Sequence, residues 1–226
     1  MSTTGTGVDI VRVSLRTALM LVLFTVSFTA LMAVTYRFTK PTIDANALRA
    51  KLELIGEVLP PSAYDNDLLK DAIALPATPA LGTETPTLLY RARRGGRPAA
   101  LVFEAVAADG YSGRIELLIA VGAGGELAAV RVTGHRETPG LGDYIEPKKD
   151  KDKAHPWISQ FDGLGFAAVR REAWRVKKDG GHFAQRSGAT ISARAVTHAV
   201  GRALQFANEN RDRLFAETGT DRRLPS

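Results

Sequence analysis

The chain has 226 residues and no cysteine. The absence of cysteine excludes disulfides, iron–sulfur clusters held by thiolates, and haem attached through a C-x-x-C-H motif. It is also compatible with an oxidising compartment. Any electron carried by this protein would therefore need an organic cofactor or a metal site without cysteine.

Several motifs of common enzyme and nucleotide-binding classes are also missing. The four histidines show no H-x-x-x-H spacing, so we expect no metal site. No G-x-S-x-G elbow, G-x-G-x-x-G or P-loop motif occurs, which leaves a hydrolase only as a remote alternative, since a triad assembles in space. The formal net charge is +6 and the pI is about 9.7. Because the basic residues are scattered, we rank nucleic-acid binding well below a membrane role and expect none.

A long uncharged run lies near the N-terminus. Residues 17–36 are twenty residues without a charge, rich in Leu, Val, Phe, Met and Ala. A helix of that length covers about 30 Å, the hydrocarbon thickness of a bilayer. A buried soluble helix or a cleaved signal peptide are the alternatives, but both fit the length and all-round apolarity less well. The sequence predicts one transmembrane helix over 17–36, after a short N-terminal segment over 1–16. Flanking charges slightly favour a cytoplasmic C-terminal side and leave the orientation open.

After Pro41 the pattern is that of a separate amphipathic helix. Thr42 is its predicted cap, Leu48, Leu52, Ile55 and Leu59 share one face, and Pro60-Pro61 ends it. A second short helix is predicted around 67–74, and 76–86 is predicted to be a loop.

The period then changes to that of strands. Four strands are predicted, over 87–93, 98–107, 114–121 and 127–133. Their short glycine-containing connections are typical of antiparallel hairpins. The predicted fold class is α+β: an N-terminal transmembrane helix followed by an antiparallel sheet flanked by helices, with the folded domain at 41–216.

The region after the strands has few regular patterns. Residues 134–143 read as a long loop, a class that often carries function. The lysine- and aspartate-rich run 148–153 is predicted to be a solvated surface turn. A short helix is expected over 155–161, and a strand over 174–178 that turns at 179–181. The last helix is predicted from Ser192 to Phe215, with a mobile tail over 217–226.

The start of that last helix carries a chemical signal. Ser187-Gly188-Ala189-Thr190 leaves the backbone bare before a β-branched hydroxyl, and Ser192 is the predicted N-cap. The free N–H groups at a helix start form an anion site, and glycine lets a phosphate approach closely. Taken alone, this stretch is explained better by an ordinary turn into a helix than by an anion site.

The combined motifs give the stronger indication. The N-terminal span is followed, in order, by Gly110-Tyr111-Ser112-Gly113, by His135-Arg136-Glu137-Thr138-Pro139-Gly140-Leu141-Gly142, by Lys178-Asp179-Gly180-Gly181 and by Ser187-Gly188-Ala189-Thr190-Ile191. Over nearly its whole length the chain closely resembles the G subunit of the Rnf electron-transport complex, and it is similar to the C subunit of the sodium-translocating NADH:quinone reductase.

The resemblance implies one FMN per chain, joined through a phosphoester to Thr190 by a periplasmic flavin transferase. It therefore implies a single-pass protein of the bacterial inner membrane with residues 1–16 in the cytoplasm and its C-terminal domain in the periplasm. The flavin would relay electrons between other membrane and soluble subunits, which couple ferredoxin–NAD redox chemistry to ion movement, and the chain would not be catalytic alone. The remaining cofactor-binding residues expected from the resemblance are Ser187, Gly188, Ala189, Glu137, Thr138, Gly140, Leu141 and Gly142.

One position departs from the family pattern. An Asp usually lies six positions before the modified Thr, and here that position is Ala184. If that acid helps the transferase recognise its substrate, attachment is slower here or depends on neighbouring groups. Two alternatives stay open: a subunit of a sodium-translocating quinone reductase, and a membrane-anchored scaffold subunit without flavin.

Overall fold

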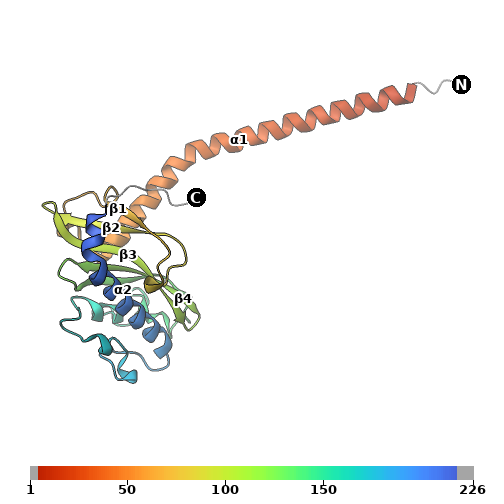
Figure 1. The fold of residues 1–226 in the computed structure, drawn as a ribbon. Coiled ribbons are helices and arrows are strands. Elements are labelled where there is room, and N and C mark those ends of the chain that lie inside the picture. The colour runs from red at the N-terminus through yellow and green to blue at the C-terminus, as the bar shows by residue number, and fades with distance from the viewer. Residues whose placement is uncertain (1–4, 218–226) are drawn as a thin grey trace. The chain divides into compact units, whose positions relative to one another are not determined.

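The computed structural model describes residues 5–217 (Figure 1). They belong to two compact units, one up to Leu52 and the other from Glu53 onward. The predicted tail at 217–226 lies outside the described residues apart from Glu217. Each unit is described by itself below.

Helix α1, Gly5–Val58, is continuous through Pro41. The separate helix predicted after Pro41, with Thr42 as its cap, was therefore wrong. The residues beyond Pro41 are rich in Ala, Leu and Glu, whose helix propensity favours continuation despite the lost backbone hydrogen bond. The helix does end at Val58, immediately before the predicted stop at Pro60-Pro61.

Within α1, the stretch Val11–Ile43 is long and apolar enough to cross a membrane, and none of its most apolar window is buried. Hydroxyl side chains in this stretch are satisfied inside the helix. Thr25 donates to the carbonyl of Leu21 at 2.8 Å, and Ser27 donates to that of Leu23 at 2.7 Å. Pairing these hydroxyls with backbone carbonyls of the same helix lowers the cost of placing them in a bilayer.

In the unit from residue 53 onward, five antiparallel strands form one sheet in chain order. They are β1 (Ala72–Leu75), β2 (Thr87–Arg94), β3 (Arg97–Gly110), β4 (Gly113–Gly122) and β5 (Leu127–Gly134). The four predicted strands and the α+β class are confirmed. Gly95 and Gly96 turn β2 into β3 with φ of +57° and +74°, a conformation that glycine adopts without strain.

The edge strand β1 was not predicted, and the helix expected at 67–74 is absent. Asp67 instead closes a turn, in which its carboxylate accepts hydrogen bonds from the N–H groups of Leu69 and Lys70. Ala72 then pairs with Tyr90 of β2. A four-residue strand has too few positions to show a period of two, so its pairing partner decides its structure.

The two faces of the sheet are covered by different elements. One face, with Phe103 of β3 and Ile119 of β4, packs against α2 and the aromatic segment before it. The opposite face, with Val102 and Leu118, packs against Ile55 and the chain around Leu68. Because successive side chains of a strand point to opposite faces, the sheet contributes to two hydrophobic cores, one on each face.

Between β5 and α2 the chain forms short 3₁₀ turns. The turn Trp157–Phe161 agrees with the short helix expected at 155–161, although it is tighter. The strand expected at 174–178 was wrong: Val176 makes only an isolated bridge to Phe183, and Lys177–Asp179 is a 3₁₀ turn. These residues bury aromatic side chains rather than pair in a sheet, since the Phe161 and Phe183 rings lie 4.7 Å apart.

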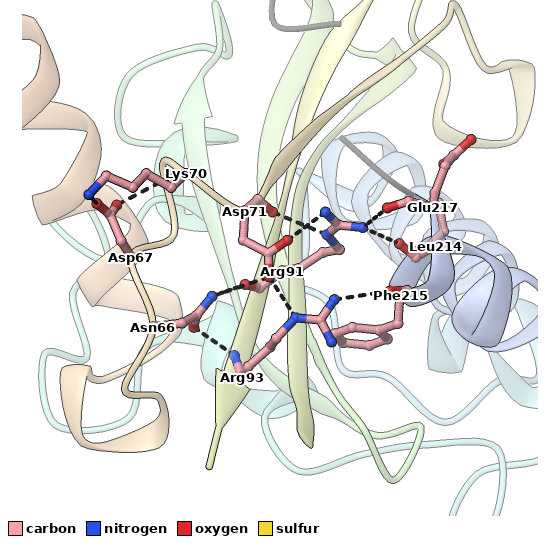
Figure 2. Close-up of polar contacts among 9 residues, drawn as sticks. All are labelled: Asn66, Asp67, Lys70, Asp71, Arg91, Arg93, Leu214, Phe215 and Glu217. Carbon is pink, nitrogen blue, oxygen red and sulfur yellow. Dashed lines mark hydrogen bonds and ion pairs between the residues drawn. The ribbon is translucent and has the colours of Figure 1, made fainter. Parts of the chain in front are cut away.

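Helix α2, Thr190–Ala216, is the last described helix and packs against β3 and β4. Its C-terminal end is held by two arginines of β2, as Figure 2 shows. Arg91, only 5% exposed, donates to the carbonyl of Leu214 at 3.2 Å and to that of Glu217. Arg93 donates to the carbonyl of Phe215 at 2.9 Å.

Asp71 and Asn66 hold these two arginines in place (Figure 2). The Asp71 carboxylate lies 2.5 Å from Nη2 of Arg91 and 2.6 Å from Nε of Arg93. Asn66 pairs with the backbone of both arginines, at 2.9 Å and 2.7 Å. The carbonyls that a helix end leaves unpaired are therefore satisfied by side chains from the sheet.

Candidate functional site

Three sequence motifs that lie far apart in the chain meet at the N-terminal end of α2. They are the β3–β4 turn, the loop after β5 and the residues that lead into α2. Together they enclose a hollow of about 120 Å³. Its lining residues are Tyr111, Glu137, Thr138, Leu141, Gly142, Gly188, Ala189, Ile191 and Ser192.

The carboxylate of Glu137 joins all three segments. It is only 4% exposed. Its Oε2 accepts a hydrogen bond from the Ser192 hydroxyl at 2.5 Å, and its Oε1 accepts one from the Ser112 N–H at 3.1 Å. Because a buried carboxylate without donors is costly, these bonds fix the loop to the turn and to the helix.

Two glycines of these motifs make room for that carboxylate. A Cβ at Gly110 would lie 2.8 Å from Oε1 of Glu137, and one at Gly142 would lie 2.9 Å from Oε2. The same Cβ at Gly142 would lie 2.8 Å from the Ser192 hydroxyl. Any side chain at either position would displace Glu137, so glycine is required there for packing.

The N-terminal end of α2 is open. The helix begins at Thr190, and within the described chain no side chain caps it and no acidic residue lies in its first turn. Gly188 adopts φ +85°, with nothing within 4 Å of where a Cβ would stand. The first N–H groups of the helix are thus available to an anion. The predicted N-cap role of Ser192 was wrong, because its hydroxyl is used by Glu137 two residues inside the helix.

The irregular segment that leads into Thr190 is held in place by Tyr144 and Arg186. The Tyr144 hydroxyl accepts from the Arg186 N–H at 3.2 Å and donates to the Ala189 carbonyl at 3.4 Å. The Arg186 guanidinium lies 4.8 Å from the centre of the Tyr144 ring and pairs with Asp150. Burial raises the pKa of the Tyr144 phenol despite the neighbouring Arg186, so the hydroxyl stays a donor at neutral pH.

Asp150 is the exception in the run 148–153, whose other five residues are exposed as predicted for a solvated turn. Its side chain is fully buried, and it accepts hydrogen bonds from the N–H groups of Trp157 at 2.7 Å and Asp152 at 3.0 Å. Burial alone would raise the pKa of this carboxyl, but these bonds and the Arg186 guanidinium together lower it. The carboxylate therefore stays charged and anchors Arg186, four residues before Thr190.

Ala184, the position that departs from the family pattern, is fixed through its backbone. Its carbonyl accepts from Trp157 Nε1 at 2.6 Å, and its N–H donates to Gln160 Oε1 at 2.8 Å. The side chain itself is exposed. The path of the chain toward Thr190 is thus set without an acid at this position.

Of the nine site residues named from sequence, six line the hollow: Glu137, Thr138, Leu141, Gly142, Gly188 and Ala189. Gly140 and Ser187 are outside its lining, and Thr190 is half-buried between the lining residues Ala189 and Ile191. Sequence reasoning did not name Tyr111, Ile191 or Ser192 as site residues. Among these three residues, only Tyr111 had a sequence signal for a role in the site, namely its position within the motif Gly110-Tyr111-Ser112-Gly113.

Exposed apolar side chains gather at this hollow. From residue 53 through 217, four large apolar side chains are exposed, and three of them line it. They are Tyr111 at 66%, Leu141 at 53% and Ile191 at 43%. Such a gathering beside a free helix end suits a ligand with a flat apolar part and an anionic part. Between residues 5 and 217 no group of three or more His, Asp or Glu side chains is placed to hold a metal ion.

Comparison with known families matches both units. Residues 4–58 match the RnfG N-terminal region, and residues 110–205 match the FMN-binding domain. The second match contains all three segments that enclose the hollow.

Curated relatives cover almost the whole chain. The G subunit of the ion-translocating oxidoreductase complex of Pseudomonas aeruginosa (strain UCBPP-PA14) is 43% identical over 205 residues, which are 91% of this chain and 94% of the relative. The corresponding protein of Photorhabdus laumondii is 42% identical over 83% of this chain and 87% of the relative. That of Vibrio cholerae is 37% identical over 88% and 92%. The chain therefore belongs to the G-subunit family of ion-translocating oxidoreductase (Rnf) complexes, as a flavoprotein component with one N-terminal apolar helix.

Proposed function

We propose that Thr190 carries FMN through a phosphoester, and that the bound flavin relays electrons between neighbouring subunits of the complex. The observation that carries this proposal is the pairing of an uncapped helix start with three exposed apolar side chains around one hollow. A phosphoester oxygen supplied by Thr190 puts the phosphate beside the free N–H groups of α2. FMN, when bound, supplies one- and two-electron redox chemistry.

The residues that line the hollow have chemical properties that suit FMN. Gly188 leaves the main chain open to a phosphate, and the half-buried residue Thr190 follows two positions later. Tyr111, Leu141 and Ile191 offer apolar surface for a flat ring. Thr138 and the buried Glu137 supply the polar edge, while Glu137 also keeps the segments together. We further propose that Ser187, Gly140 and Gly142 shape the backbone around the cofactor.

A covalent link suits a carrier outside the cytoplasm, where a dissociable flavin would be lost. We therefore propose that the domain from residue 53 onward faces the periplasm, that one flavin is attached per chain by a flavin transferase, and that the lipid bilayer surrounds the uncharged run 17–36 within Val11–Ile43. The proposed electron carrier has no catalytic residue of its own, and its partners supply the electron donor and acceptor.

The direct test replaces Thr190 with Val in the full chain, co-expressed with its transferase. Flavin fluorescence after denaturation and the intact mass should show one FMN in the parent protein and none in Thr190→Val. Ser187→Ala, which removes the other hydroxyl of the same loop, is the matched control and should keep its flavin. Flavin that stays covalently bound in Thr190→Val would exclude this assignment.

The departure at Ala184 favours a second candidate, a scaffold protein of the complex that carries no flavin. Under the main proposal the parent protein binds FMN covalently, and Ala184→Asp speeds attachment or leaves it unchanged. Under the scaffold alternative the purified parent protein shows no added mass and no flavin absorbance, even with the transferase present.

A further inference from the structure

A second hollow, of about 480 Å³, lies between α2 and the segment 166–179. It shares no lining residue with the hollow at the start of α2. Three arginines stand around it, namely Arg171, Arg175 and Arg202, and the imidazole of His198 lies among them. The function proposed above makes no use of this surface.

The surroundings of this hollow are strongly basic. Residues 170–179 contain five lysine or arginine side chains and two carboxylates, those of Glu172 and Asp179, in a chain whose total formal charge is +6. Arg171, Arg175 and Arg202 are all exposed. Positive charge is therefore concentrated here rather than spread evenly over the surface.

Nearby carboxylates neutralise only part of this charge. Asp179 is occupied by Arg194, whose Nε and Nη2 lie 2.5 Å and 2.8 Å from its oxygens, and this pairing lowers the pKa of the Asp179 carboxyl. Arg171 lies 3.3 Å from Glu209 and over the ring of Phe166. Between residues 5 and 217, no hydrogen bond or ion pair engages the guanidinium groups of Arg175 and Arg202.

The floor of the hollow is rigid. Trp174 is 5% exposed, and its indole N–H donates to the carbonyl of Val169 at 3.0 Å. Gly201, in the middle of α2, lets the helix approach this indole, because a Cβ there would lie 3.3 Å from Cβ of Trp174. A glycine inside a helix is destabilising relative to alanine, and what Gly201 provides in return is the close packing of Trp174. The arginines are thus displayed from fixed elements.

We propose that this basic hollow docks an acidic segment of a neighbouring protein of the complex, whose carboxylates pair with Arg175 and Arg202. Guanidinium groups bind carboxylates through two parallel hydrogen bonds. An exposed ion pair contributes little by itself, so a single small anion gains little from an open hollow of this kind. A segment with several carboxylates can form several ion pairs at once on one rigid surface. A member of a multi-subunit complex has neighbouring proteins that could supply such a segment. This inference does not depend on the flavin.

The first test measures binding of a fluorescein-labelled poly-glutamate peptide to the full chain in phosphatidylcholine nanodiscs, by anisotropy at low salt. The test variant is Arg175→Glu with Arg202→Glu. Its matched control is Arg94→Glu with Arg97→Glu, which makes the same change in net charge on exposed residues of the β2–β3 hairpin. We expect about tenfold or greater loss of affinity in the test variant and at most about twofold loss in the control.

Equal losses in the two variants would mean that net charge alone attracts the peptide, and would overturn the proposal. Displacement of the peptide by inorganic phosphate, at an ionic strength where chloride fails, would overturn it in favour of a small-anion site.

The second test uses the assembled complex, with a photo-cross-linking residue in place of Gln205, which lines the hollow. The proposal expects a cross-link to a carboxylate-rich peptide of another protein of the complex, and expects Arg175→Glu with Arg202→Glu to remove it. A cross-link to phospholipid, or to a peptide without carboxylates, would contradict it. Flavin content measured on the same samples separates this result from a failure of the flavin assignment.

Discussion

The two ends of helix α2 differ in how their backbone groups are satisfied. At the C-terminal end, Arg91 and Arg93 donate to the carbonyls of Leu214, Phe215 and Glu217. At the N-terminal end, no side chain of the described residues caps the helix, and glycine and exposed apolar groups surround it. The chain completes one end itself and leaves the other end open.

This difference suggests that the C-terminal end of α2 contributes to stability and the N-terminal end to ligand binding. Backbone groups at helix ends need partners, and proteins usually supply them from side chains. An end closed by a buried arginine contributes to folding and has no capacity for a ligand. An end with free N–H groups beside an apolar hollow gains its partner only when something binds. Substitutions at the two ends should therefore affect different properties of the protein.

Arg91→Ala should destabilise the protein most, by about 3 kcal/mol, because it removes a buried charge partner and leaves the carbonyl of Leu214 unpaired. Asp71 keeps Arg93 as a partner, which limits the loss. Urea unfolding followed by tryptophan fluorescence would measure it, since both tryptophans lie in the unit from residue 53 onward.

Arg94→Ala, at an exposed position on the same strand, is the control and should change stability by at most about 0.5 kcal/mol. Flavin per folded chain should be unchanged in both variants. Similar destabilisation by the two substitutions would refute the role of the C-terminal arginines.

Asp150→Asn should cost about 2 kcal/mol at neutral pH, since it removes the charged partner of Arg186. The folded-state pKa of Asp150 is lowered, so its carboxylate stabilises the protein above the unfolded pKa, which is about 3.9. That stability is lost as the pH falls through the lower folded pKa. The difference between parent and variant should therefore be constant near neutrality and shrink in acid.

Unfolding curves at several pH values would measure that difference. Glu172→Gln, which removes an exposed carboxylate away from this turn, is a suitable control. A difference that stays the same in strong acid would show that the charge of Asp150 is not what stabilises the turn.

Leu141→Ser should have the smallest effect on stability, at most about 0.5 kcal/mol, because this side chain is already 53% exposed. In the flavinylated protein it should leave the attached flavin in place but uncover part of the ring. Iodide quenching of flavin fluorescence should then become stronger than in the parent. Unchanged quenching would mean that the ring lies elsewhere.

The sequence predicted the sheet better than the segments around it. Four strands could be located because each is long enough to show alternation and is bounded by glycine turns. Strand β1 has four residues, and its structure depends on Tyr90 and Leu89 across the ladder. The continuity of α1 through Pro41 likewise depends on the balance of many residues rather than on the proline alone.

The site was predicted in part, for related reasons. The motifs around Glu137 and Thr190 were visible as short patterns. The bond between Glu137 and Ser192, 55 positions apart, was not, and it reversed the expected role of Ser192. Asp150 sits in a run of charges that is typical of a solvated surface, and only its tertiary contacts with Trp157 and Arg186 show that it is buried.

Helix α2 follows every strand of the sheet in the described chain. The sheet pairs its strands in chain order and can assemble early from neighbouring hairpins. The hollow, in contrast, needs the turn at Tyr111, the loop at Glu137 and the start of α2 together. A nascent chain that has not yet reached residue 190 has strands but no site. The order of synthesis therefore makes this site a marker of a finished domain, because whatever binds there recognises only protein in which α2 is in place.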